Sequence, residues 1–401
     1  MSINPKLDIL KQIIDKQQEK DELSKYKMHS IMYDLVIETV KDKHLILYGG
    51  FALNILLPKK HRIYKQKTLP DIDCFSENAK EDAISIANLL HERGYKFIEV
   101  KSAIHAGTYK VFAEFMPIAD ITQVTKSMFE YLTNNSVIDK NTGLSICPPE
   151  FLMWSLYKEL ARPEGSGFRW EKIFSRYIIF HKHHKFIDKS KLKCFPEDSP
   201  TVDKFADFIK EQKWPLIGQK AVSLYLNIDC KPLEKMYAFD IIVENIDEAF
   251  TQIQKNFHMD NLDTLTLQTY TTKSLKELTN KIGFVKHNNT RLCKLYETDS
   301  CYSFQKKQNF IIGSVDTVLH FLYANYMISK QFDTSPSHAS QKDDSTPVAI
   351  QKLIIALEKY ALTLDIKERF KISCYGYEKT ATNVKKENWF KKAFNYRPDK
   401  I

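Results

Sequence analysis

The sequence lacks the long apolar runs and the paired cysteines that mark several large classes of protein. No window holds the roughly 18 uninterrupted apolar residues of a membrane-spanning helix. The first residues, 1–6, carry no apolar signal region. The seven cysteines are scattered and form no Cys-x-x-Cys pair, a usage typical of a reducing compartment. We therefore expect a soluble, cytoplasmic chain with no membrane partner.

Glycine is also scarce, with 11 residues in 401, and the common glycine-rich phosphate motifs are missing. There is no Gly-x-x-x-x-Gly-Lys-Ser/Thr loop, which excludes a P-loop NTPase. The single Gly-x-Gly, at Gly165 to Gly167, follows no predicted strand and lacks a third glycine. Kinase and Rossmann-type dinucleotide sites are excluded on the same ground.

The composition is that of a globular, moderately basic protein. Apolar residues make up 43% of the chain, and 401 residues suffice for two or three domains with their own cores. A net charge of +9 and a pI near 8.9 are compatible with a polyanionic partner. Charge therefore permits nucleic-acid binding without proving it.

A glycine pair and three aspartates form the most informative pattern. Gly49 and Gly50 end an apolar run and let a strand turn sharply into a helix, whose first N–H groups can face a triphosphate. Asp71 and Asp73 lie at i and i+2 of a predicted strand, so they project to one side, about 7 Å apart. Asp120 lies in a second apolar run that can pair beside the first. Three carboxylates suit two oxygen-preferring cations about 4 Å apart.

Further nucleotide-binding candidates flank this pattern. Phe51 and Asn54 follow the glycines on the same predicted helix. Lys158, Arg169 and Lys172 lie on helices predicted after the core, where their charges would pass over a bound triphosphate. A solvated helix face is the alternative explanation for each of these three cations.

The second half of the chain repeats the first in outline. Residues 216–226 align with 47–57, and residues 239–243 align with 70–74 at the same offset. In this alignment Gln219 replaces the second glycine and Ile242 replaces the second aspartate. The repeat predicts a second unit with the same fold and no chemistry, although the match is short enough for coincidence.

These motifs resemble the DNA polymerase β-like nucleotidyltransferases, and among them the poly(A) polymerase catalytic subunits of large DNA viruses of the poxvirus and giant-virus type. The resemblance is carried by Tyr-Gly-Gly-Phe-Ala-Leu, Pro-Asp-Ile-Asp, Ala-Asp-Ile-Thr and Arg-Trp-Glu-Lys, and is strongest over residues 45–177. It implies a mixed α/β (α+β) fold, with a nucleotidyltransferase core, helical elements and a degenerate second nucleotidyltransferase-like domain.

The expected domains follow this division of the chain. They are an N-terminal helical segment over residues 1–42, the catalytic core with its following helices over 43–190, the degenerate domain over 191–332, and a linker, helix and basic-aromatic tail over 333–401. The tail mixes cations with aromatic residues, which suits either nucleic-acid binding or docking on its own domain.

The activity implied by the resemblance is template-independent addition of AMP from ATP to the 3′ end of viral mRNA, with two Mg²⁺ or Mn²⁺ ions. Asp71 and Asp73 would hold both ions, and Asp120 the one that activates the primer hydroxyl. Gly49 and Gly50 would bind the phosphates. Many relatives carry serine after the first glycine, so at Gly50 backbone N–H groups must replace a hydroxyl.

The resemblance also implies partners and a location. The partners are ATP, a single-stranded RNA 3′ end, and either a second copy of the chain or a separate processivity subunit. The location is the cytoplasmic viral factory of an infected cell, or the virion. Two alternative functions stay open: another polymerase β-like enzyme adding CCA, uridylate or one nucleotide to a small acceptor, and an inactive RNA-binding or processivity scaffold.

Overall fold

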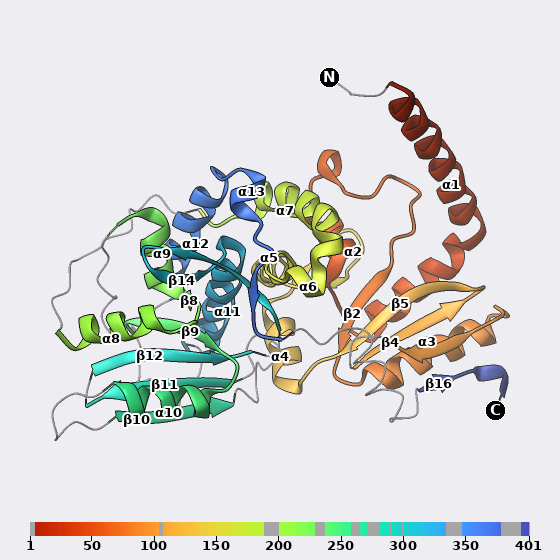
Figure 1. Ribbon diagram of the computed structural model, residues 1–401. Coiled ribbons are helices and arrows are strands. Elements are labelled where there is room, and N and C mark those ends of the chain that lie inside the picture. Colours follow the sequence, from red (N-terminus) through yellow and green to blue (C-terminus); the bar gives the residue numbers. More distant parts are fainter. Residues whose placement is uncertain are drawn as a thin grey trace. The chain divides into compact units, whose positions relative to one another are not determined.

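The computed structural model divides into two compact units, residues 1–148 with 384–401, and residues 149–383 (Figure 1). Both units mix helices with a mixed sheet, which confirms the expected fold class. The predicted domain boundaries remain a proposal. The predicted boundary after residue 190 and most of the predicted linker, residues 334–346, lie outside the described part of the chain. The described residues are 5–103, 107–187, 200–228, 237–257, 265–271, 281–288, 290–298, 300–333, 347–377 and 394–400.

The first unit is built on an eight-stranded sheet with the order β16-β3-β4-β5-β2-β1-β7-β6. Strands β2 and β5 are parallel, as are β1 and β7, and the other neighbours are antiparallel. The strands are β1 (Ile46–Leu47), β2 (Ile72–Ser76), β3 (Glu99–Ser102), β4 (Thr108–Ala113), β5 (Met116–Gln123), β6 (Val137–Ile138), β7 (Ser145–Ile146) and β16 (Asn395–Tyr396). The helices are α1 (Pro5–Asp42), α2 (Gly49–Leu56), α3 (Ala79–Glu92) and α4 (Lys126–Asn135).

Helix α3 packs against one face of this sheet, over β4 and β5. Its apolar side, which includes Ala83, Ile86 and Leu90, is buried. From Lys110 to Ala113 of β4, half-buried residues alternate with buried ones, because successive side chains point to opposite faces: Val111 and Ala113 are buried. The opposite face of β4 is therefore the one that remains partly accessible.

The N-terminal segment forms the single long helix α1. In its second half Met32, Val36 and Val40 are buried. Leu10 and Ile13, which also lie at helical spacing, are at least half exposed. The predicted N-terminal helical segment is thus one helix, whose second half packs on the first unit.

The end of the chain adds an edge strand to the first unit. In β16, Asn395 pairs with Lys101 of β3, and Arg397 donates two hydrogen bonds to Glu99, at 3.0 and 2.8 Å. Residues 395–397 thus dock on their own chain, which is one of the two alternatives predicted for the tail. Residues 385–393 of the predicted tail lie outside the described part.

The second unit contains another eight-stranded sheet, ordered β10-β11-β12-β9-β8-β14-β13-β15. Seven strands of this sheet match seven of the first in order and relative direction: β10, β11, β12, β9, β8, β14 and β13 correspond to β3, β4, β5, β2, β1, β7 and β6. Its strands are β8 (Leu216–Ile217), β9 (Phe239–Val243), β10 (Leu265–Thr271), β11 (Lys281–His287), β12 (Thr290–Glu297), β13 (Tyr302–Lys307), β14 (Phe310–Gly313) and β15 (Cys374–Tyr375). The repeated topology confirms the prediction that the second unit repeats the fold of the first.

Helices complete the second unit. They are α5 (Pro149–Leu160), α6 (Pro163–Ser166), α7 (Trp170–His184), α8 (Pro200–Glu211), α9 (Gly218–Leu226), α10 (Ile246–Asn256), α11 (Val315–Asp333), α12 (Pro347–Ala361) and α13 (Ile366–Arg369). Helix α5 packs against α7 and α11, and α11 packs against α12.

The register of the repeat differs from the one that the sequence predicted. Gly218 opens α9 with φ +69°, as Gly49 opens α2 with φ +68°. A Cβ on Gly218 would meet Asp240, and a Cβ on Gly49 would meet Asp73. Asp240 therefore takes the place of Asp73, and the predicted equivalence of Ile242 with Asp73 is wrong by two residues.

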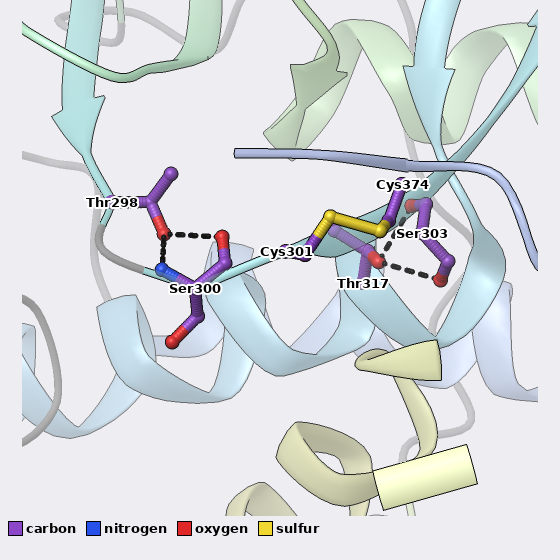
Figure 2. Close-up of a disulfide and its surroundings, with 6 residues drawn as sticks. All are labelled: Thr298, Ser300, Cys301, Ser303, Thr317 and Cys374. Carbon is purple, nitrogen blue, oxygen red and sulfur yellow. Dashed lines mark hydrogen bonds between the residues drawn. A yellow bond between two sulfur atoms is a disulfide. The ribbon is translucent and has the colours of Figure 1, made fainter. Parts of the chain in front are cut away.

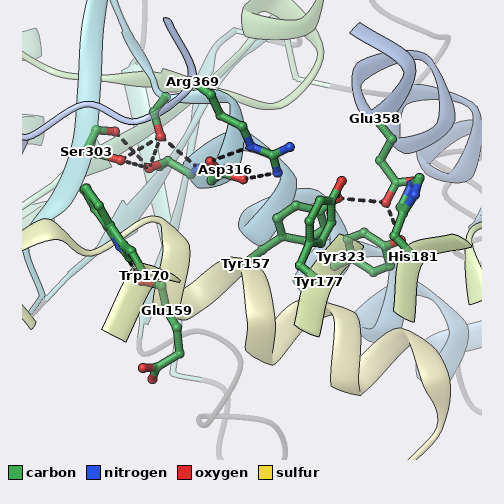
Figure 3. Close-up of polar contacts among 12 residues, drawn as sticks. Tyr157, Glu159, Trp170, Tyr177, His181, Ser303, Asp316, Tyr323, Glu358 and Arg369 are labelled. Atoms are coloured by element: carbon green, nitrogen blue, oxygen red, sulfur yellow. Dashed lines mark hydrogen bonds and ion pairs between the residues drawn. The ribbon is translucent and has the colours of Figure 1, made fainter. Parts of the chain in front are cut away.

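Buried polar groups link the helices of the second unit (Figure 3). The carboxylate of Glu358 accepts hydrogen bonds from the hydroxyls of Tyr157 and Tyr323, at 3.0 and 2.8 Å. Arg369 donates to Asp316 at 2.7 Å, and both side chains are almost completely buried. These bonds tie α5, α11, α12 and α13 together, since buried charges are stable only when they are paired.

A disulfide joins Cys301, beside β13, to Cys374 in β15 (Figure 2). The two cysteines are 73 residues apart in the chain, so the scattered spacing, which indicated a reducing compartment, did not predict the pair. Cys74, Cys147 and Cys293 are free and buried, and burial raises the pKa of each thiol well above its usual value. Buried thiols of this kind are chemically inert.

Within the described residues, no helix combines the length and apolar character needed to cross a lipid bilayer.

Candidate active site

Asp73 and Asp120 are direct neighbours in the first sheet. Asp73 lies in β2 and Asp120 in β5, and their Cα atoms are register partners in the parallel pair. Parallel neighbours lie about 4.8 Å apart and side chains in register project to the same face, so the two carboxylates share one surface. The expectation that the run containing Asp120 pairs beside the first aspartate strand is confirmed.

Gly49 brings the start of α2 against Asp73. Its backbone has φ +68°, and a Cβ at this position would lie 2.4 Å from the Asp73 Oδ2 atom. Only glycine tolerates both conditions. Tyr48 precedes the helix in an extended conformation, and its side chain does not cap the helix. The first N–H groups of α2, including that of Gly50, thus begin next to a carboxylate, where an anion-binding helix terminus and a cation site would adjoin.

Tyr48 lies beside the two acids, on the next register pair of the same face, Phe75 and Thr122. Its backbone N–H donates to the Asp73 carbonyl at 2.9 Å, and its hydroxyl lies 2.8 Å from the Thr122 Oγ1 atom. The ring stacks on Phe75, with centroids 4.0 Å apart. Burial, followed by the charge of Asp73, raises the pKa of Tyr48 far above its usual value. Tyr48 is therefore an uncharged side chain that is held in place beside the carboxylates.

Lys110 pairs with the third aspartate. It lies in β4 directly opposite Asp120, and its Nζ atom is 2.7 Å from one carboxylate oxygen and 2.8 Å from the other. The side chains are 29% and 22% exposed, so the pair is partly shielded from water. A positive group thus already occupies one side of Asp120.

Asp71 lies one residue before β2 and is exposed. Among the described residues, one group of three potential metal ligands has its atoms within 4.8 Å of one another: Glu164, Cys301 and Cys374. Two of these residues, Cys301 and Cys374, form the disulfide. The three aspartates do not form so tight a group. The structure makes Asp73 and Asp120 register partners, whereas Asp71 lies outside β2 and belongs to no register pair of the described strands.

The next two candidates lie on α2. Asn54 is buried, and its Oδ1 atom accepts the backbone N–H of Tyr64 at 2.9 Å, which fastens the loop between α2 and β2. Phe51 contacts Tyr33 of α1 edge to face, with centroids 6.1 Å apart. Both side chains have structural contacts in the first unit, and their part in nucleotide binding remains a proposal.

The three cationic candidates belong to the second unit. Lys158 of α5 lies over the Trp154 ring, with Nζ 5.1 Å from its centroid. Arg169 precedes α7 and pairs with Glu159 at 3.2 Å. Lys172 is an exposed residue in the first turn of α7. Their role at a triphosphate also remains a proposal.

Sequence reasoning missed Tyr48, Thr122 and Lys110. Lys110 could have been found by counting back across the β4–β5 hairpin, but its turn, Glu114-Phe115, contains none of the residues that mark such turns. Tyr48 and Thr122 have no signal of their own, because a hydroxyl pair between distant residues needs the folded sheet.

The donors that the site offers suit divalent ions such as Mg²⁺ or Mn²⁺. Asp73 and Asp120 present carboxylate oxygens on one surface, and these hard cations prefer oxygen ligands. The position of Lys110 shows that the surface already attracts one positive group. What this arrangement can do chemically is hold cations and phosphate oxygens together beside the start of a helix.

Comparison with known proteins agrees with this geometry. Residues 34–166, which contain Gly49 and all three aspartates, match the family model of the poly(A) polymerase catalytic subunit. A protein of Acanthamoeba polyphaga mimivirus named "Putative poly(A) polymerase catalytic subunit" is 29% identical over 209 residues, 51% of this chain and 35% of that protein. One of the same name from African swine fever virus (isolate Pig/Kenya/KEN-50/1950) is 34% identical over 157 residues, 39% and 32% of the two chains. The matches thus span about a third of these relatives' length.

The crystal structure of the Megavirus polyadenylate synthase superposes on the whole chain. The TM-score is 0.78 at 16% identity, and the match covers 100% of this chain and 87% of that one. At this identity the likeness establishes a shared fold. Together the comparisons confirm the resemblance found in the sequence: residues 34–166 carry the signature of the viral poly(A) polymerase catalytic subunit family, on the fold of a viral polyadenylate synthase.

Proposed function

We propose that this chain is a template-independent poly(A) polymerase, which transfers AMP from ATP to the 3′ end of RNA, viral mRNA being the natural acceptor. The observation that carries the proposal is the pairing of Asp73 with Asp120 on one surface beside the start of α2 at Gly49. The family match over residues 34–166 supports it.

The acids would hold the catalytic cations. Asp71 and Asp73 would bind both of two Mg²⁺ or Mn²⁺ ions, and Asp120 would bind the one nearer the primer hydroxyl. Such ions, when bound, neutralise charge on the transferring phosphoryl group and lower the pKa of the attacking hydroxyl. Asp73 lies close to the backbone of Gly49 and is fixed in β2 beside Asp120, which places it between the proposed phosphate and metal positions.

The start of α2 would bind the triphosphate. The N–H groups at Gly49 and Gly50 would face the β- and γ-phosphates and stabilise the pyrophosphate as it leaves. Lys158, Arg169 and Lys172 are proposed to contribute positive charge to nucleotide binding, and Phe51 and Asn54 are proposed to take part in nucleotide binding as well. Because the hydroxyl proton is already acidified, no side-chain general base is required.

The partners and location follow from the same proposal. The chain would bind a single-stranded RNA 3′ end and ATP, and would work in the cytoplasm of an infected cell or inside the virion. A second copy or a processivity subunit would complete the assembly. Leu10 and Ile13 of α1, both at least half exposed, offer such a partner an apolar contact.

The experiment is to incubate the purified chain with labelled single-stranded RNA, Mg²⁺ or Mn²⁺, and each NTP in turn. The proposal predicts long products with ATP. Short additions with CTP or UTP would indicate another polymerase β-like enzyme. No extension with any NTP, in a protein that still binds RNA, would indicate an inactive scaffold and overturn the proposal.

A further inference from the structure

Four charged side chains form one row across the first sheet. Asp73 of β2 is the register partner of Asp120 in β5, Asp120 is the partner of Lys110 in β4, and Lys110 is the partner of Lys101 in β3. Register partners project to the same face of a sheet. The row therefore runs from the proposed metal site toward the β3 side, and its charge changes from negative to positive.

The positive end of the row lies on the face that α3 does not cover. Lys110 is 29% exposed and Lys101 is 46% exposed. Phe112, two residues after Lys110, is also half exposed, and the Nζ atom of Lys101 lies 5.5 Å from its ring centroid. Glu99, the register partner of Phe112, forms ion pairs with both Lys101 and Arg397, and the Arg397 side chain is 41% exposed. Three cations around one carboxylate and an aromatic ring leave a net positive surface that suits single-stranded nucleic acid, in which phosphates and bases alternate.

The strand order decides which substrate this surface would take. Gly49, where the triphosphate is proposed to bind, follows β1, and β1 lies on one side of β2. Strands β5, β4 and β3 lie on the other side. In phosphoryl transfer the attacking and leaving oxygens are roughly in line, on opposite sides of the phosphorus. If pyrophosphate leaves toward Gly49, the attacking 3′ hydroxyl must come from the side of Asp120 and Lys110.

We propose that Lys101, Lys110 and Phe112 form the track on which the 3′-terminal nucleotides of the RNA primer lie. Neighbouring strands are about 4.8 Å apart, so Lys110 lies one strand and Lys101 two strands beyond Asp120. Lys110 binds the phosphate nearest the reacting end, Lys101 binds an earlier phosphate, and Phe112 contacts a base. The inference rests on the proposed function, because it assigns the primer to that site.

The ion pair with Asp120 gives Lys110 a second role. A cation bound by Asp120 competes with the Lys110 ammonium for the same carboxylate oxygens. The ammonium, which is already partly desolvated, then turns to a phosphate on the primer side. Lys110 is thus a positioning residue, which holds Asp120 before the primer arrives and the primer afterwards.

The test is RNA binding in the presence of Mg²⁺ and without ATP, which does not depend on catalysis because no nucleotide donor is present. A fluorescein-labelled single-stranded oligo(A) is titrated with the full chain over a range of KCl concentrations. The variants are Lys101→Ala, Lys110→Gln, the double variant, and Lys110→Arg, which keeps the charge. The matched control is Lys126→Ala, a lysine of the same unit that is 79% exposed on α4.

We expect each single loss of charge to weaken RNA binding about threefold to tenfold, and to lower the slope of log K against log[salt] by about 0.7, or about 1.4 in the double variant. Lys110→Arg and Lys126→Ala should bind like the wild type, and ATP binding should not change. Thermal melting shows whether each variant is folded. If the folded double variant binds RNA with the affinity and the salt slope of the wild type, the proposed track is wrong.

The two proposals fail in different ways. If the wild type extends RNA with ATP while the double variant binds RNA normally, the track is wrong and the polymerase assignment stands. If the lysines govern RNA binding but no NTP is incorporated, the track stands as an RNA-binding surface and the polymerase assignment fails.

Discussion

Asp240 of β9 and Lys294 of β12 are register partners in the second sheet, in the positions that Asp73 and Asp120 occupy in the first. Burial raises the pKa of Asp240, while the charge of Lys294 and a hydrogen bond from the Tyr296 hydroxyl, at 3.3 Å, lower it. A fixed lysine thus supplies the positive charge that an ion would supply between two acids. In the described part of the second sheet, the register position of the second acid is thus taken by a cation.

The two equivalent glycines provide a matched pair of substitutions. Gly49→Ala and Gly218→Ala each force alanine to a positive φ and place a Cβ 2.4 and 2.0 Å from an aspartate oxygen. We expect both to lower the free energy of unfolding by about 1–2 kcal/mol or more. Only Gly49→Ala should also abolish ATP binding.

Equilibrium urea unfolding and binding of a fluorescent ATP analogue check this pair. Equal loss of ATP binding in both variants would contradict the assignment of the triphosphate to α2.

The disulfide between Cys301 and Cys374 should contribute to the stability of the second unit. It closes a loop of 73 residues, for which the chain-entropy estimate is about 4 kcal/mol. We expect a reductant to lower the melting temperature of the wild type. The double variant Cys301→Ser, Cys374→Ser should melt at the reduced value with or without reductant. Identical melting of the oxidised and reduced wild type would show that the bond adds no stability.

His320 makes the stability of the second unit depend on pH. Burial, followed by the charges of Lys158 and Arg162, holds the pKa of His320 well below its ordinary value of 6.5, and the ring lies 3.1 Å from the Tyr302 hydroxyl. Below pH 6.5 the unfolded chain therefore binds a proton that the folded chain does not. The unfolding free energy must fall as the pH is lowered, by up to about 1.4 kcal/mol per pH unit.

The check compares urea unfolding of the wild type and His320→Gln at neutral pH and one unit below the ordinary histidine pKa. The wild type should lose about 1 kcal/mol more than the variant on acidification. An equal loss in both proteins would assign the pH dependence to other groups.

The site could be predicted where it depends on local rules. The apolar run around Asp73 predicted a strand there, which is β2, and the glycine pair marked the turn into α2. Asp71 lies one residue before β2, so its place beside Asp73 stays a prediction. Asp120 was placed correctly because a buried apolar run pairs most readily with another in the same sheet.

The partner of Asp120 could not be predicted in the same way. Lys110 faces it across a hairpin whose turn residues, Glu114 and Phe115, both have positive φ, a conformation that neither residue type signals. A β-bulge after Val111 changes the register further. Counting residues across such a turn gives no reliable pair.

The repeat shows a different limit of sequence reasoning. The predicted alignment set Asp240 against Asp71, whereas the structure sets it against Asp73. A shift of two residues leaves every side chain on its original face, so the apolar pattern is the same in both registers. Only the pairing of β9 with its neighbours distinguishes the two.

The central claim is that the pair of Asp73 and Asp120 carries the chemistry and that its counterpart in the second unit does not. The most direct measurement is extension of labelled single-stranded RNA with ATP and Mg²⁺ by Asp73→Asn and by the register-matched Asp240→Asn. We expect Asp73→Asn to lose activity about a thousandfold or more, and Asp240→Asn to extend RNA like the wild type. Near wild-type extension by a folded Asp73→Asn protein, or an equal loss in both variants, would contradict the account.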